Sequence, residues 1–162
     1  MTTVEHGYTI DEEASSEREL RDFLKGLVRV VRPSLVVETG TYLGRAALAI
    51  SEALAMNLHG WLVTCDVREY TPASYFHGRR ITLRQCRGVD LPELRQADLV
   101  FLDSDYRERR AEFDLVKPGA LVVIHDTRIS YDSEVPPHET WVRELGGLLF
   151  ETHRGFALVR KA

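Results

Sequence analysis

The chain has 162 residues and a mass of 18.5 kDa, a size that suits one domain with a substantial core. Its 44% hydrophobic and 28% charged content is typical of a soluble globular protein, and its net charge of −4 argues against a general nucleic-acid or anionic-membrane binder. No apolar stretch approaches membrane-spanning length, and the polar N-terminus lacks signal-peptide features. Cys65 and Cys86 indicate free thiols in a reducing compartment, so we expect a cytoplasmic protein.

The first sixteen residues are polar and acidic without clear periodicity, and we expect a flexible arm there. Ser16 and Glu19 have the spacing of a capping box, and apolar residues then recur at helical spacing up to Val31. Pro33 ends this helix, and the chain enters a strand over residues 35–38.

From that strand onward, strands and helices alternate. Strands are predicted at 61–65, 80–85, 97–103 and 120–124, helices at 45–56 and 107–116, and weaker helical signals at 73–78 and 91–95. The continuous β-branched runs indicate strands covered on both faces, which is typical of a parallel sheet. Segments 148–152 and 156–160, joined by His153-Arg154-Gly155, instead predict an antiparallel hairpin.

The most informative stretch joins the strand at 35–38 to the helix that begins at residue 45. Gly40 and Gly44 have no Cβ to keep a ligand off the backbone, and the helix start offers free N–H groups. Their spacing matches neither the dinucleotide fingerprint nor the phosphate loop, which makes an NAD-dependent oxidoreductase a poorer hypothesis. Glu38 favours a cationic ligand over a pyrophosphate.

Acidic residues stand at the carboxyl ends of the predicted parallel strands, where ligands bind in open α/β sheets. They are Glu38, Asp66, Asp103 and Asp126. Asp66 stands where an acid typically takes both ribose hydroxyls of a nucleoside; the alternative is a helix N-cap without a ligand. Asp103 and Asp126 end neighbouring strands, so a divalent cation, a shared proton or a basic side chain must neutralise them.

Arginines cluster at Arg79-Arg80, at Arg84 and Arg87, and at Arg107, Arg109 and Arg110. We interpret these clusters as a solvated face with ion pairs to nearby acids. The negative net charge gives no reason to expect a nucleic-acid surface there.

In this order and spacing, four groups of residues resemble the class I S-adenosylmethionine-dependent methyltransferases. They are V-E-T-G-T-Y-L-G at 37–44, T-C-D at 64–66, D-L-V-F-L-D at 98–103, and L-V-K-P-G-A at 115–120 followed by V-V-I-H-D at 122–126. Within that class the chain is similar to small-molecule O-methyltransferases of the catechol and caffeoyl-CoA type and their bacterial relatives. The resemblance implies an α/β, Rossmann-like, doubly wound fold over residues 17–162, with a mostly parallel seven-stranded sheet and a C-terminal antiparallel hairpin.

The resemblance also implies a site for S-adenosylmethionine (SAM). The implied cofactor residues are Glu38, Gly40, Thr41, Tyr42 and Gly44 in the glycine turn, Asp66 at the ribose, Arg87 and Gly88 beside the adenine, and Asp103. Metal-dependent members hold Mg²⁺ or another divalent cation at positions that match Asp103, Asp126 and Thr127. Those members carry asparagine where this chain has threonine, which is a poorer ligand.

A second departure concerns the general base. The family's lysine is replaced here by Tyr106, a weak base at neutral pH when its pKa is unperturbed. His125, directly before Asp126, is the natural alternative, unless its ring packs on the other face of the sheet. The catalytic candidates are therefore Asp103, Tyr106, His125 and Asp126.

The acceptor side is expected to bind a small hydroxylated metabolite for O-methylation, without nucleic acid or membrane partners. Tyr131, His138 and Trp141 are candidate substrate residues. The alternative for Trp141 is that it begins the next helix and packs in the core. A neighbouring subunit could complete the pocket, so a homodimer stays open. Two other functions stay open as well: a non-catalytic SAM-binding partner protein, and a cyclisation or elimination that uses the same cofactor.

Overall fold

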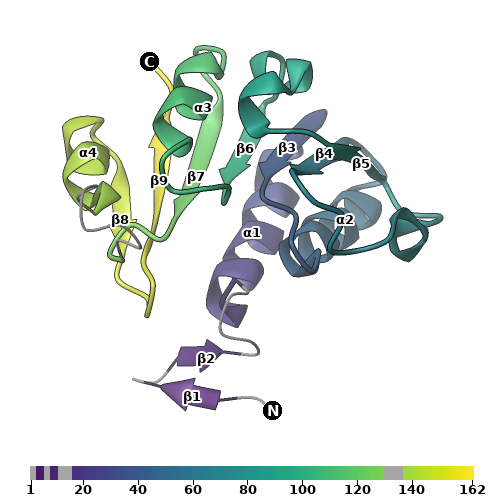
Figure 1. Ribbon diagram of the computed structural model, residues 1–162, viewed down its shortest axis with the longest axis horizontal. Coiled ribbons are helices and arrows are strands. Elements are labelled where there is room, and N and C mark those ends of the chain that lie inside the picture. The colour runs from purple at the N-terminus through teal and green to yellow at the C-terminus, as the bar shows by residue number, and fades with distance from the viewer. Residues whose placement is uncertain (1–2, 6–7, 11–15, 130–136) are drawn as a thin grey trace.

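The computed structural model describes residues 3–5, 8–10, 16–129 and 137–162. Its centre is one sheet with the strand order β5-β4-β3-β6-β7-β9-β8 (Figure 1). The strands are β3 (Leu35–Thr39), β4 (Trp61–Asp66), β5 (Ile81–Gln85), β6 (Leu99–Leu102), β7 (Leu121–His125), β8 (Leu148–Phe150) and β9 (Phe156–Arg160). Strands β3 to β7 pair in parallel, and β9 is antiparallel to both β7 and β8. The predicted fold class is confirmed.

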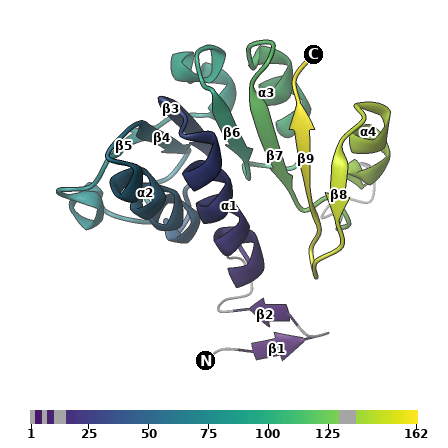
Figure 2. The ribbon, with the colours of Figure 1, turned by 180° about the vertical axis from the view of Figure 1, so that it is seen from behind.

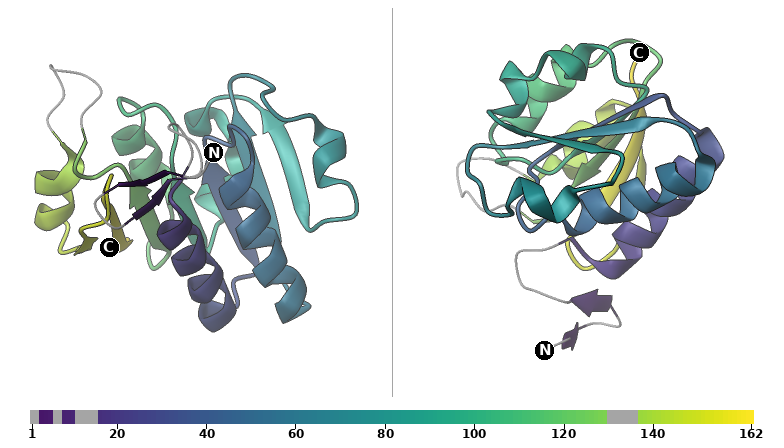
Figure 3. Two further views of the ribbon diagram at one scale, coloured as in Figure 1. Left: turned by 90° about the horizontal axis from the view of Figure 1, so that it is seen from below. Right: turned by 90° about the vertical axis from the view of Figure 1, so that its right-hand side faces the viewer.

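Helices cover both faces of this sheet (Figure 3). The helices are α1 (Arg18–Val31), α2 (Arg45–Asn57), α3 (Arg109–Leu115) and α4 (His138–Glu144), with short 3₁₀ turns η1 (Ala73–Phe76), η2 (Gly88–Asp90) and η3 (Pro92–Arg95). Figure 2 shows α1 and α2 in front of the sheet. Along β6, Leu99 and Phe101 pack with these two helices, whereas Val100 and Leu102 pack with α3 and α4. This alternation is why the strand is apolar throughout.

The N-terminal region differs from the expectation in two ways. Strands β1 (Thr3–Glu5) and β2 (Tyr8–Ile10) form a separate antiparallel pair near the start of α1 (Figure 1); the rest of the expected arm up to residue 15 lies outside the described residues. The predicted capping box of Ser16 and Glu19 is wrong, because α1 begins after Glu17 and has no side-chain cap. The Glu17 carboxylate instead bonds His125 and the backbone N–H of Arg154.

The weaker helical signals at 73–78 and 91–95 correspond to the 3₁₀ turns η1 and η3. The strand predicted at 97–103 is shorter than expected, since β6 spans Leu99–Leu102, with Asp98 just before it and Asp103 just after it. Within the described ranges, no helix is long and apolar enough to cross a membrane.

Candidate active site

The glycine turn after β3 packs directly against the end of β6. Gly40 has φ +88°, and a Cβ on it would overlap the backbone carbonyl of Asp103. Gly44 has φ +72°, and a Cβ there would lie 2.6 Å from the Phe76 ring. Both glycines are therefore required by the packing of the protein itself, apart from any room they leave for a ligand.

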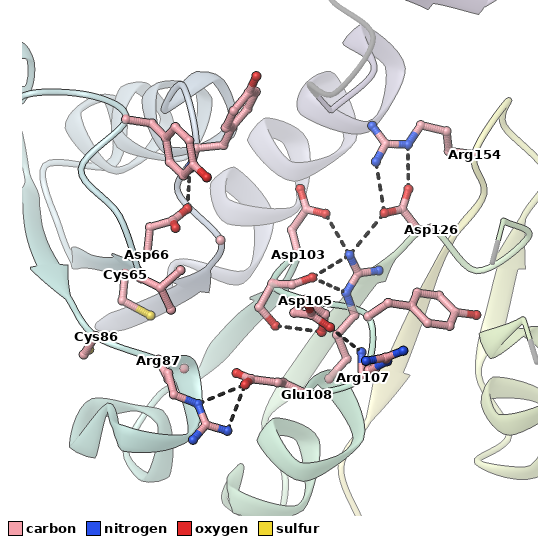
Figure 4. A pocket seen from close by; sticks show the side chains of 18 residues that line it. Cys65, Asp66, Cys86, Arg87, Asp103, Asp105, Arg107, Glu108, Asp126 and Arg154 are labelled. Carbon is pink, nitrogen blue, oxygen red and sulfur yellow. Dashed lines mark hydrogen bonds and ion pairs between the residues drawn. The ribbon is translucent and has the colours of Figure 1, made fainter. Parts of the chain in front are cut away.

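A pocket of about 700 Å³ opens at the carboxyl ends of the parallel strands (Figure 4). That volume lies within the range of small-molecule sites. Its walls include many of the residues expected from the sequence: Gly40, Tyr42, Asp66, Arg87, Gly88, Asp103, Tyr106 and Asp126. They also include residues that the sequence did not single out for the site, among them Arg107, Glu108, Arg109 and Arg154.

Asp66 joins the end of β4 to the glycine turn. Its Oδ2 accepts the backbone N–H of Tyr42 at 2.9 Å, and its Oδ1 accepts that of Arg68 at 3.3 Å. The alternative of a helix N-cap is not what the structure shows, because the chain makes a turn here and η1 begins later. The residue lies on the pocket wall.

Glu38 is a buried acid at the bottom of the glycine turn. The Thr64 hydroxyl donates to its Oε2 at 2.5 Å, and the hydroxyls of Thr41 and Thr64 lie 2.6 Å apart. Burial raises the pKa of Glu38 to about 8, the Thr64 bond opposes this, and the charges of Asp103 and Asp66 add to it. A cation held against the glycine turn would favour the ionised form.

The other side of the pocket contains a cluster of buried charges. His125 is fully buried, with Nδ1 2.8 Å from Asp103 Oδ1 and Nε2 2.6 Å from Glu17 Oε2. Burial alone would lower the pKa of His125, but the charges of Asp103 and Asp126 and the two carboxylate bonds raise it to about 10. The ring is therefore an imidazolium at neutral pH, with both N–H groups donated to carboxylates. This geometry leaves no ring nitrogen to accept a proton from an acceptor.

Asp126 follows β7 in the left-handed region, with φ +54°. Arg154 donates to it through two nitrogens, Nε to Oδ1 at 2.6 Å and Nη2 to Oδ2 at 3.0 Å. Arg109 Nη2 donates to the same Oδ2 at 3.1 Å and to Asp103 Oδ1 at 3.4 Å. Figure 4 shows Arg154 beside Asp126, with the two bonds between them drawn as dashed lines. Burial would raise the pKa of Asp126, but His125 and the two arginines hold it well below its usual range.

Two of the three predicted metal ligands, Asp103 and Asp126, lie close together, with His125, which was not predicted as a ligand, beside them. Ligand atoms of Asp103, His125 and Asp126 lie within 4.8 Å of one another. Two guanidinium groups, however, already use both carboxylate oxygens of Asp126. Thr127 Oγ1 is buried and has no hydrogen-bond partner among the described residues. This donor set fits the basic side chains and not an added divalent cation.

Of the remaining candidates among the described residues, Tyr106 lines the pocket, whereas His138 and Trp141 are buried and are not part of its wall. Tyr106 is on the pocket wall and stacks on His138, with ring centroids 3.8 Å apart. Burial raises the pKa of Tyr106, so less of it is ionised at neutral pH and able to take up a proton. Burial, together with Arg109 and Arg110, lowers the pKa of His138 to about 4. Trp141 packs edge-on against Phe113 in the core, which was the alternative prediction to a role in the substrate pocket. Tyr131 lies outside the described residues.

The expected adenine side of the pocket lies after β5. Arg87 Nε donates to Glu108 Oε1 at 2.9 Å and its Nη2 lies 2.8 Å from the same atom, which links this segment to the residues before α3. A Cβ on Gly88 would overlap the Glu112 carboxylate. Cys65 and Cys86 are free thiols on the same wall.

Comparison with known proteins supports this architecture through structure alone. No protein-family model and no curated protein sequence matches the chain. Among solved structures, it is similar to a methyltransferase from Geobacter sulfurreducens (16% identity, TM-score 0.71, covering 92% of this chain and 81% of that one). It is also similar to the O-methyltransferase TomG from Streptomyces achromogenes in complex with SAM (18%, 0.66, 93% and 83%) and to an O-methyltransferase from Bacillus cereus in complex with S-adenosylhomocysteine (SAH; 17%, 0.66, 91% and 82%). At these identities the likeness establishes the fold.

Proposed function

We propose that the protein is a SAM-dependent methyltransferase (EC 2.1.1) that methylates an oxygen of a small hydroxylated acceptor. The observation that carries this proposal is the pocket at the strand ends, whose wall joins the glycine turn to the carboxylate of Asp66, with the acid Glu38 buried below that turn. Structures with the same fold hold SAM or SAH. A cytoplasmic location and a homodimer stay predictions.

The cofactor half of the pocket suits SAM in both charge and shape. Asp66 would accept the ribose hydroxyls, since each carboxylate oxygen has a second lone pair beside its backbone bond. Glu38 is buried without a cation beside it among the described residues and is mostly protonated at neutral pH, so the positive charge of the methionine part would favour its ionisation. We assign the adenine side to Arg87 and Gly88, which line the pocket after β5.

When bound, SAM supplies an electrophilic methyl carbon, and attack by the acceptor oxygen breaks its bond to sulfur and releases SAH. The chain contributes mainly by orienting the acceptor against that carbon. Asp103 is the most accessible carboxylate of the charge cluster, with 18% of its side chain exposed, and it lies between the two halves of the pocket. We assign it the task of accepting a hydrogen bond from the acceptor hydroxyl, with Tyr106 also on the pocket wall, next to Arg109.

The direct test is transfer of an isotopically labelled methyl group from SAM to a panel of phenols and hydroxylated metabolites, followed by mass spectrometry. We expect a labelled product that depends on Asp103, so that Asp103→Asn lowers kcat by about 10²-fold or more while SAH binding is kept. Asp114→Asn, at an exposed acid on α3, is the matched control.

Two other outcomes would decide against methyl transfer to oxygen. SAM binding with no product from any acceptor, unaffected by loss of Asp103 or Asp126, would favour a non-catalytic partner protein. SAM consumption without methyl transfer would favour cyclisation or elimination.

A further inference from the structure

We infer that the guanidinium groups of Arg109 and Arg154 take the place that a divalent cation would have between Asp103 and Asp126. The site is then metal-independent. This inference rests on the proposed function, and it removes the need for an acceptor whose two neighbouring oxygens chelate a metal.

The first argument is the occupancy of the Asp126 carboxylate. Oδ1 accepts from Arg154 Nε at 2.6 Å, and Oδ2 accepts from Nη2 of both arginines at 3.0 and 3.1 Å. These bonds use both lone pairs of Oδ2 and one of Oδ1, so a cation coordinated at roughly 2.0–2.6 Å would have to displace a guanidinium from Oδ2 or crowd beside Arg154 at Oδ1. Arginine stays charged at any pH the protein experiences, so its positive charge would also repel the ion.

The second argument is that the position of Arg109 is set by the backbone. Its Nε and Nη2 donate to the Ser104 carbonyl at 3.0 and 2.9 Å, and its Nη1 donates to the His125 carbonyl at 2.6 Å. Only 3% of the side chain is exposed. Because the ends of β6 and β7 supply these acceptors, the guanidinium is a fixed part of the sheet edge and would not swing aside for an ion.

The third argument concerns what the arrangement offers an acceptor. Arg109, Arg154, Asp103 and Asp126 all lie on the wall of the main pocket. Their charges balance, and their polar atoms are hydrogen-bonded to one another. In this arrangement no metal ion would be present to chelate two neighbouring oxygens of an acceptor. A single hydroxyl needs only one hydrogen-bond acceptor, which Asp103 provides. Arg109 and Arg154 are therefore positioning residues for that carboxylate and for Asp126.

The test measures metal binding directly, without turnover. Mn²⁺ is titrated into the protein at about 100 µM, and the electron paramagnetic resonance signal of free Mn²⁺ is recorded. We expect the signal to match that of buffer. Uptake of one Mn²⁺ per chain that Asp126→Asn abolishes would overturn the inference.

A second measurement uses Arg154→Met, with Arg143→Met at an exposed arginine of α4 as the matched control. Removing Arg154 leaves the Asp126 carboxylate short of positive charge, so millimolar Mg²⁺ should raise the melting temperature of this variant by roughly 3 °C or more. Wild type and Arg143→Met should not respond. A wild type that responds like Arg154→Met, or an Arg154→Met protein that ignores Mg²⁺, would contradict the inference.

Calorimetric titration with SAH in the presence of EDTA separates this inference from the proposed function. Loss of SAH binding would count against the methyltransferase proposal, whereas the Mn²⁺ result stands whether or not SAH binds. Tight SAH binding in EDTA, with methyl transfer unchanged within about twofold once an acceptor is known, supports both.

Discussion

Replacement of His125 by glutamine should destabilise the protein in a way that depends strongly on pH. In the wild type, burial opposes protonation of this ring, but Asp103, Asp126 and Glu17 outweigh it and raise its pKa from 6.5 to about 10. Below pH 6.5 the ring is protonated in both the folded and the unfolded chain, so its contribution to stability is complete. As the pH rises toward 10, the folded chain keeps a proton that the unfolded chain has released, and the contribution falls to zero.

The difference between these two pKa values corresponds to on the order of 4 kcal/mol. Urea unfolding of wild type and His125→Gln at about pH 6 should therefore show a loss of this size, shrinking to about 1 kcal/mol near pH 10, where only hydrogen bonds differ. His59→Gln, at an exposed histidine, is the control and should cost less than about 0.5 kcal/mol at both values. Equal losses for His125→Gln at the two pH values would refute the imidazolium assignment.

Three further predictions test other parts of the site. Glu38→Gln should weaken SAM binding about tenfold. Because Glu38 ionises near pH 8, the affinity of the wild type for SAM should rise between pH 7 and 9, and that of the variant should not; calorimetry across this range checks both effects. Gly40→Ala should cost about 2–4 kcal/mol in chemical denaturation, because its Cβ meets the Asp103 backbone, whereas Gly78→Ala has a similar φ but open space and should cost about 1 kcal/mol; equal costs would be contrary to the packing argument. His138→Phe should leave the melting temperature unchanged or slightly raised, because both ring nitrogens are buried and lack a partner among the described residues; a loss above about 2 kcal/mol would show that they are bonded after all.

The fold was readable from the sequence because its signals are local. The apolar strands, the glycine turn and the acids after each strand need only a few neighbouring residues to be recognised, and the parallel sheet follows from them. Helix limits were less exact. Glu17 shows why: a remote histidine, 108 positions away, decides how its carboxylate is used, and no helix-start rule contains that information.

For the same reason, only part of the buried charge cluster could be predicted from the sequence. The acids Asp103 and Asp126 called for a neutralising partner, and a basic side chain was one of the options. Arg109 was assigned to a solvated face and Arg154 to a hairpin turn, although both are buried against Asp126. Their pairing depends on β9 returning beside β7, a long-range contact that composition does not encode. The signal in the sequence that pointed to this pairing was the need of Asp103 and Asp126 for a compensating positive charge.

The most direct test of the central claim is calorimetric titration of the protein with SAM, in EDTA, alongside Asp66→Asn and the exposed control Asp114→Asn. The account predicts micromolar binding by wild type and by the control, and about 10- to 100-fold weaker binding by Asp66→Asn, because a charged acceptor for the ribose hydroxyls is lost. No binding by the wild type, or equal binding by all three proteins, would contradict it.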